Sequence, residues 1–167
     1  MASEALVLTV VGAGTGLAAV IDLRTRRIPN ALTAALAVIG FGIAALELGP
    51  VGLGGALLGC ALGLAFMLPG HIFGGTGGGD VKLFAAAGAL LGPATTVQAF
   101  LFTAIAGGVL ALAIAVRRNR VQRTLGATAR LMSSGSAGTA AIEAPDLDNR
   151  FAYAPAIAVG VIMAALL

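Results

Sequence analysis

Charged residues, cysteine, histidine and tryptophan are scarce or absent in this sequence. Of its 167 residues only 10% are charged, one is a cysteine, one is a histidine and none is a tryptophan. A single cysteine excludes both a disulfide framework and a cysteine-based zinc site. In their place the chain has 59% hydrophobic residues and a mean hydropathy of +1.01, which is not the composition of a soluble domain. We therefore interpret it as an integral membrane protein.

Apolar runs recur along the whole chain, and most approach the ~17–25 residues that a helix needs to cross the hydrocarbon core. They predict an all-α, polytopic fold of about six transmembrane helices in one domain covering 1–167. The predicted spans are 5–21, 31–48, 51–69, 81–98, 97–116 and 152–167. The fourth is the weakest, because its clean apolar part is short and Gly92-Pro93 interrupts it.

Basic residues occur in only three places: 24–27, Lys82 and 117–150. With six spans these places lie on one side of the membrane, which the positive-inside tendency identifies as the cytoplasm. The prediction is a protein of the cell's inner (cytoplasmic) membrane, with both termini outward and a cytoplasmic loop at about 117–150. Orientation in the lipid bilayer accounts for the basic residues, so no nucleic-acid partner is expected.

Glycine is frequent, and three glycines of the third predicted span repeat every four residues. Gly55, Gly59 and Gly63 would line one helix face without side chains. Such a face lets a second helix approach closely in the membrane. We interpret this pattern as a packing signal.

Two of the seven acidic residues are placed differently from the rest. Asp22 ends the first predicted helix and Asp80 begins the fourth, so the predicted topology puts both at the cytoplasmic membrane edge. Ionisable groups at membrane depth are usually functional. The alternative is two juxtamembrane ion pairs, Asp22 with Arg26 and Asp80 with Lys82.

Paired carboxylates that share a proton can activate water for attack on a peptide bond. No competing nucleophile is better placed, and the lone His71 is interpreted as a loop residue rather than a base or a metal ligand. No metal site and no cofactor are expected. The glycine-rich stretch before Asp80 matches neither a dinucleotide fingerprint nor a phosphate loop.

Two motifs carry a family resemblance. "DLRTRRIPN" at 22–30 and "GGGDVKL" at 77–83 resemble the two aspartate motifs of the type IV prepilin peptidases, and "FAYAPAIAVG" at 151–160 is similar to the last helix of that family. The resemblance implies a membrane aspartic endopeptidase with Asp22 and Asp80 as its catalytic pair. Its substrate would be a prepilin or pseudopilin, cleaved after a short basic leader at the cytoplasmic face. Site-supporting residues on the two motifs would be Arg27, Pro29, Asn30, Gly77, Gly78, Gly79 and Lys82.

Longer members of that family carry four cysteines and also N-methylate the new terminus. This chain resembles the minimal form associated with Flp-type tight-adherence pili, so the implied activity is the peptidase alone. Pilus assembly or secretion machinery is an implied partner.

The glycines before Asp80 would leave room for an extended substrate backbone and would tolerate the φ angles of a turn into the helix. Helix dipoles favour an ionised Asp80 at a helix start and a protonated Asp22 at a helix end. We therefore expect Asp80 to be the base. Arginines near Asp22 oppose this assignment.

Two other classes of function fit parts of the pattern. A small ion- or proton-coupled transporter would use the two carboxylates as a relay between glycine-packed helices, although such relays lie near the bilayer midplane. A non-enzymatic membrane subunit of a secretion system would tolerate the loss of both acids.

Overall fold

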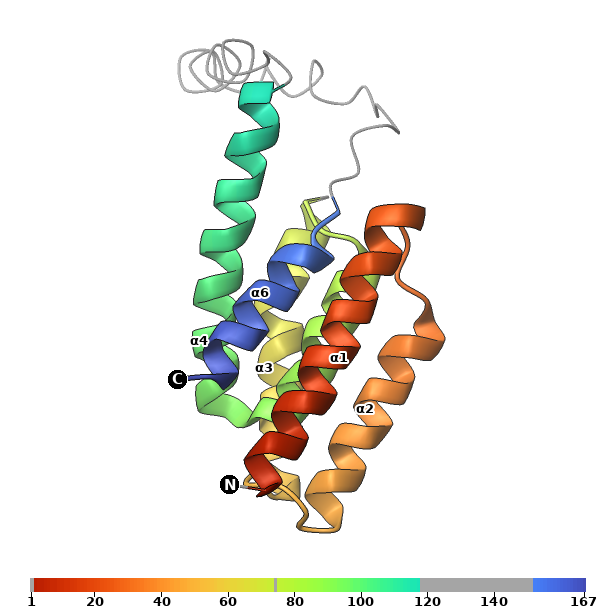
Figure 1. The fold of residues 1–167 in the computed structure, drawn as a ribbon, viewed down its shortest axis with the longest axis vertical. Helices are drawn as coiled ribbons and strands as arrows, with labels where there is room; N and C mark the ends of the chain where they lie inside the picture. Colours follow the sequence, from red (N-terminus) through yellow and green to blue (C-terminus); the bar gives the residue numbers. More distant parts are fainter. Residues whose placement is uncertain (1, 74, 118–151) are drawn as a thin grey trace. The chain divides into compact units, whose positions relative to one another are not determined.

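The computed structural model describes residues 2–73, 75–117 and 152–167, and these ranges form five helices without a strand (Figure 1). The helices are α1 (Ala2–Thr25), α2 (Asn30–Ala45), α3 (Leu53–Ile72), α4 (Gly78–Arg117) and α6 (Ala154–Ala165). The all-α fold is therefore confirmed. The predicted loop at about 117–150 lies, beyond Arg117, outside the described residues.

The chain divides into two compact units, Met1–Gly107 with Phe151–Leu167, and Gly108–Arg150. The first unit contains both aspartates and most of the described helices. In the second unit, the described residues continue α4 from Gly108 to Arg117.

Helix α4 is two helical arms joined at Gly92, which has φ 73° and ψ 175°. A side chain is almost never tolerated at these angles, and Pro93 supplies no N–H to continue the first arm. The rings of Phe84 and Phe100 lie 6.3 Å apart between centroids. In one straight helix these residues would be separated by about 24 Å along the axis. The chain therefore folds back at Gly92.

This fold-back corrects one predicted boundary. The predicted fourth and fifth spans meet at 97–98, whereas in the structure the two arms meet at Gly92. The stretch after Gly92, Pro-Ala-Thr-Thr-Val-Gln, is only weakly polar, and the predicted fourth span was extended across it. If the two arms are counted separately, the described residues contain six helical segments.

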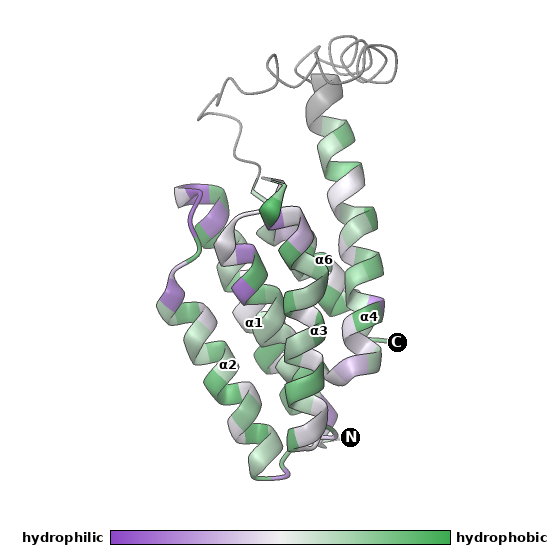
Figure 2. Cartoon of the chain, turned by 180° about the vertical axis from the view of Figure 1, so that it is seen from behind, coloured by the Kyte–Doolittle hydropathy of each residue, from purple (hydrophilic) through white to green (hydrophobic). Residues whose placement is uncertain are grey.

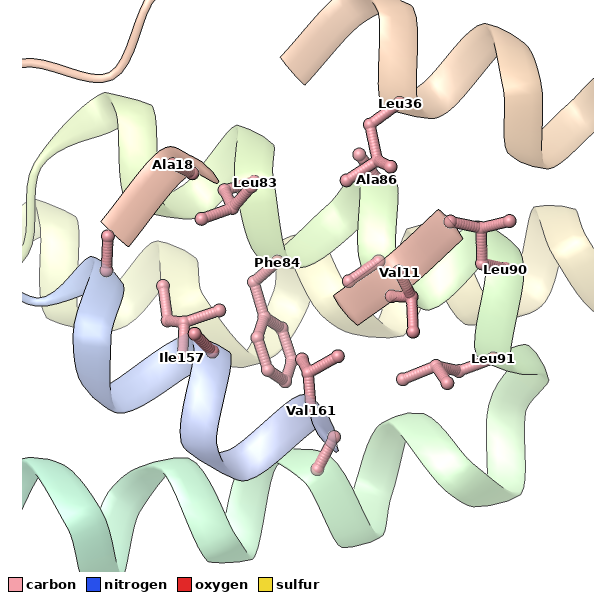
Figure 3. Close-up of a cluster of buried hydrophobic side chains, with 14 of the residues drawn as sticks. Val11, Ala18, Leu36, Leu83, Phe84, Ala86, Leu90, Leu91, Ile157 and Val161 are labelled. Atoms are coloured by element: carbon pink, nitrogen blue, oxygen red, sulfur yellow. The ribbon is translucent and has the colours of Figure 1, made fainter. Parts of the chain in front are cut away.

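The first arm, 78–91, is the centre of the fold. From Val81 to Leu91 only Lys82 is exposed. A helix that is apolar on all sides can be surrounded by lipid or by other helices, and the burial of this arm shows that other helices surround it. Figure 3 shows Phe84 of this arm among Val11 of α1 and Ile157 and Val161 of α6.

The predicted glycine face of α3 packs against this central arm. A Cβ atom built on Gly59 would overlap the carbonyl oxygen of Gly88, and one on Gly63 would lie 2.8 Å from the carbonyl oxygen of Phe84. Only glycine permits backbones to approach this closely. The packing prediction for Gly59 and Gly63 is confirmed, whereas Gly55 meets mainly Val51.

The outer surfaces of the helices are apolar, as a membrane protein requires. Large exposed side chains on them include Leu17, Val38, Leu57, Leu64 and Leu101. Three helices are long and apolar enough to span a bilayer, namely Ala2–Thr25, Leu53–Ile72 and Gly78–Ala113, while α2 and α6 are shorter. In Figure 2 hydrophilic colour gathers where α1 ends and α2 begins. The number of crossings stays a prediction.

Candidate active site

Five helix ends meet at one end of the first unit. The C-terminal turn of α1 contacts the start of α6 through Asp22 and Ala154, and the start of α2 contacts the first turns of α4 through Asn30 and Lys82. The last turn of α3 joins them, because the His71 ring lies 3.6 Å from the position of a Cβ on Gly78. This convergence brings the two aspartate motifs together.

Asp22 is a buried carboxylate in the last turn of α1. Its side chain is 6% exposed, and Oδ2 accepts a hydrogen bond from the backbone N–H of Ala154 at 3.3 Å. The Asp22 carbonyl accepts the N–H of Arg26 at 2.8 Å, which ends the helix, and Arg26 then has a φ of 55°. The charge of Arg26 acts on the Asp22 carboxylate.

Asp80 is the third residue of α4 and is 5% exposed. Its Oδ2 accepts the backbone N–H of Gly77 at 2.9 Å, so the carboxylate caps its own helix. Its Oδ1 is buried and has no hydrogen-bond partner among the residues that the structure describes. The charge of Asp22 acts on the Asp80 carboxyl group, so the two acidic side chains lie near each other.

The three glycines before Asp80 were expected to adopt φ angles that other residues tolerate poorly, and none of them does. Gly78 and Gly79 already belong to α4, and among the described glycines only Gly92 has a positive φ. Gly79 is needed for close packing instead, since its Cβ would lie 3.0 Å from Cβ of Ile28. Gly77 contributes the N–H that Asp80 accepts. The expectation of a turn made by glycine φ angles was wrong.

The ion pair of Lys82 with Asp80, which was the alternative to a functional site, does not form. The Nζ of Lys82 donates to Oδ1 of Asn30 at 2.9 Å. With Ile28 against Gly79, this bond attaches the segment after α1 to the first turns of α4. Arg27 and Pro29 of the same segment are exposed. Pro29 serves as the residue before α2, where its fixed φ of −63° suits a helix start.

Tyr153 and Ala154 were missed by the sequence analysis. Tyr153 precedes α6, and its ring packs against Gly107, where a Cβ would lie 2.7 Å from the phenol oxygen. Burial, and then the Asp80 carboxyl group when it is ionised, raise the pKa of the Tyr153 phenol. It therefore remains a hydroxyl at neutral pH. The available signal was that Tyr153 is the only tyrosine of the chain and precedes the helix-start pattern Ala-Pro.

The arrangement suits proton transfer between two carboxyl groups. Two buried acids close together cannot both ionise easily, so a pair of this kind would share a proton, and one acid would then accept a proton while the other donates one. Within the described ranges no group of three His, Cys, Asp or Glu side chains is arranged to hold a metal ion.

These features define a helical membrane protein with a buried pair of carboxyl groups at one end of its bundle. A model of the type IV leader peptidase family matches residues 9–112, more than half of the sequence, and the chain belongs to that family. The match includes both aspartates and ends before Tyr153. No curated protein and no solved structure matches the chain.

Proposed function

We propose that this type IV leader peptidase is an aspartic endopeptidase with Asp22 and Asp80 as its catalytic pair. Its substrate is a Flp-like type IV prepilin, which it cleaves after the short basic leader at the cytoplasmic face of the inner membrane. The observation that carries the proposal is the burial of both carboxyl groups in one site, from two motifs far apart in sequence.

The position of the pair also supports a peptidase over an ion relay. Asp22 lies in the last turn of α1 and Asp80 in the first turn of α4, so both lie at helix ends rather than mid-helix. A carboxylate relay across a membrane requires acids near the midplane. A leader peptide that meets the membrane edge would reach both acids there.

The remaining parts of the proposal concern the surroundings of the site. The whole chain acts as one membrane peptidase domain, the segment at about 117–150 is its cytoplasmic loop, and pilus assembly or secretion machinery is its partner. Arg27, Pro29, Asn30, Gly77, Gly78, Gly79 and Lys82 support the pair by holding the motifs together. The contacts of Lys82 with Asn30 and of Gly79 with Ile28 support this role.

Co-expression with a Flp-type prepilin tests the proposal, with the mass of the pilin N-terminus as the readout. The wild-type chain should remove the leader, while Asp22→Ala and Asp80→Ala should each remain in the membrane and cut cleavage at least ~100-fold. Glu47→Gln changes an exposed acid beyond the end of α2 and is the matched control, which should cleave normally. Substantial cleavage by Asp80→Ala would rule out the aspartic mechanism, even if the prepilin is the correct substrate.

A further inference from the structure

The first turn of α6 has one backbone donor available for another part of the protein. Pro155 has no N–H, and the N–H of Ala156 donates to the carbonyl of Tyr153 at 3.0 Å. The N–H of Ala154 has no intrahelical acceptor at this position, as in any first turn. It donates to Oδ2 of Asp22. A side chain of α1 therefore caps α6.

This cap bears on which aspartate is ionised. The N-terminus of α6 carries partial positive charge and Arg26 adds a full one, so both favour an anion at Asp22, and the C-terminal end of α1 opposes it. Asp80 has a comparable helix N-terminus in α4 and the N–H of Gly77. The two sites differ in that one oxygen of Asp80 is buried without a hydrogen-bond partner in the described part of the chain.

A buried ionised carboxylate with a bare oxygen carries the full desolvation cost of that oxygen. A proton on Oδ1 removes the charge and makes this buried atom a hydrogen-bond donor, which a substrate carbonyl that enters the site would accept. The unpartnered oxygen therefore favours the protonated form at Asp80. This reverses the assignment that the dipoles of α1 and α4 alone suggested.

We propose that the first turn of α6 is a third component of the active site, and that Ala154 is a positioning residue. Its N–H orients Asp22 and keeps it as the ionised base, while Asp80 holds the shared proton on Oδ1. The proposal rests on the proposed aspartic function and adds to it a segment that lies outside the family match.

The protons balance in this assignment. Asp22 takes a proton from water as the water oxygen bonds to the scissile carbonyl carbon, and Asp80 gives its proton to the carbonyl oxygen. When the C–N bond breaks, Asp22 returns its proton to the leaving nitrogen. Asp80 recovers a proton from one hydroxyl of the diol, which becomes the new carboxyl group. The pair then has its starting charges.

Asparagine substitutions separate the two roles, with the full chain in membranes and a Flp-type prepilin as the probe. An amide at 80 can still donate to the carbonyl, whereas an amide at 22 cannot accept the proton of water. Asp80→Asn should therefore cleave at least ~10-fold faster than Asp22→Asn. Equal rates, or a faster Asp22→Asn enzyme, would overturn the assignment. A wild-type chain that leaves the prepilin intact would instead contradict the proposed function.

A coupling measurement tests the role of Ala154 without relying on cleavage. Ala154→Pro removes the N–H, and Ala154→Gly keeps it and reports the cost of changing the side chain alone. The proline variant should lower the thermal unfolding midpoint more than the glycine variant does. At least half of this shift should disappear when Asp22 is replaced by alanine, because the acceptor is already gone.

The same proline shift should persist in an Asp80→Ala background. This background controls for movement of Tyr153, because a residue before proline is pushed out of the helical region that Tyr153 occupies, and its phenol interacts with Asp80. Coupling of Ala154→Pro to Asp80 rather than to Asp22 would overturn the proposal. The proposal would also be overturned if Ala154→Pro lowered the thermal midpoint by the same amount in the wild-type, Asp22→Ala and Asp80→Ala backgrounds.

Discussion

A hydrogen bond between the side chains of Lys82 and Asn30 connects the two aspartate motifs. It is exposed, so its contribution is that of an ordinary solvent-accessible bond with one charged partner, about 0.5–1.5 kcal/mol. Lys82→Met should slow leader cleavage by about 2–10-fold, within the range of that energy, if the bond helps to align Asp80 with Asp22. Cleavage kinetics measure this loss.

A double substitution distinguishes alignment from a direct charge effect. If Lys82 acts through Asn30, then Asn30→Leu should cause a similar loss and the double variant should be little worse than either single one. Asn30→Asp, which keeps an acceptor oxygen, should lose less than Asn30→Leu. Full activity of Asn30→Leu beside a slow Lys82→Met would show that the lysine acts by its charge alone.

At this scale the sequence identified the acids but not their partners. Asp22 and Asp80 stand out because carboxylates are rare in apolar chains and both lie at predicted helix ends. The N–H of Ala154 is invisible in sequence, because every residue except proline has one, and only the fold shows which carboxylate it reaches. The alternative pairing of Lys82 with Asp80 was suggested by their proximity along the chain. In the structure Lys82 instead binds Asn30, at the start of α2.

Close packing of α3 on the first arm of α4 holds the central helix in place. Leucine at Gly59 would collide with the backbone of Gly88, which cannot rotate away as a side chain can. Overpacking of this kind typically costs about 1–3 kcal/mol or more. We expect Gly59→Leu to lower both the yield of folded protein and its thermal midpoint in detergent.

The matched control is Gly54→Leu on the same helix. Nothing lies within 4 Å of a Cβ built at Gly54, so leucine there meets open space and also improves helix propensity. Its midpoint should equal or exceed that of the wild type. Equal midpoints for the two variants would show that the contact between Gly59 and Gly88 contributes little to stability.

The elements themselves were largely predictable, and the exceptions have physical causes. Long apolar runs and a four-residue glycine repeat located α1 and α3 and the packing face of α3. The predicted break in α4 was placed at 97–98 because the fourth span was extended across the short stretch 93–98, and an uncharged stretch of this kind does not show whether the helix folds back or continues. The Gly-Pro pair was the better signal, since glycine tolerates the required φ and proline cannot continue the first arm.

Charge is distributed unequally between the two ends of the first unit. Arg24, Arg26, Arg27 and Lys82 lie where α1 ends and α4 begins, at the end that carries the paired aspartates. Glu4 lies in the first turn of α1, and Glu47 lies after α2. Sequence alone supplied this asymmetry. What it could not supply is that the start of α6 joins the basic end, which follows from the bond between Ala154 and Asp22.

The orientation of the whole molecule follows if the basic end faces the cytoplasm. Single cysteines in a Cys60→Ala background test it, labelled in intact cells with a reagent that does not cross the inner membrane. Phe73→Cys and Arg24→Cys lie at the basic end and should be labelled only after the cells are opened. Leu48→Cys, between α2 and α3 at the other end, should be labelled in intact cells.

All three native positions are exposed, so differences in labelling would report the side of the membrane rather than burial. Denatured samples of each variant give the maximum labelling against which the intact-cell signal is normalised. The reverse pattern would place Asp22 and Asp80 on the outer side. A leader that remains in the cytoplasm would then be out of their reach, so this result would contradict the proposed cleavage side while leaving the paired carboxyl groups as a candidate site.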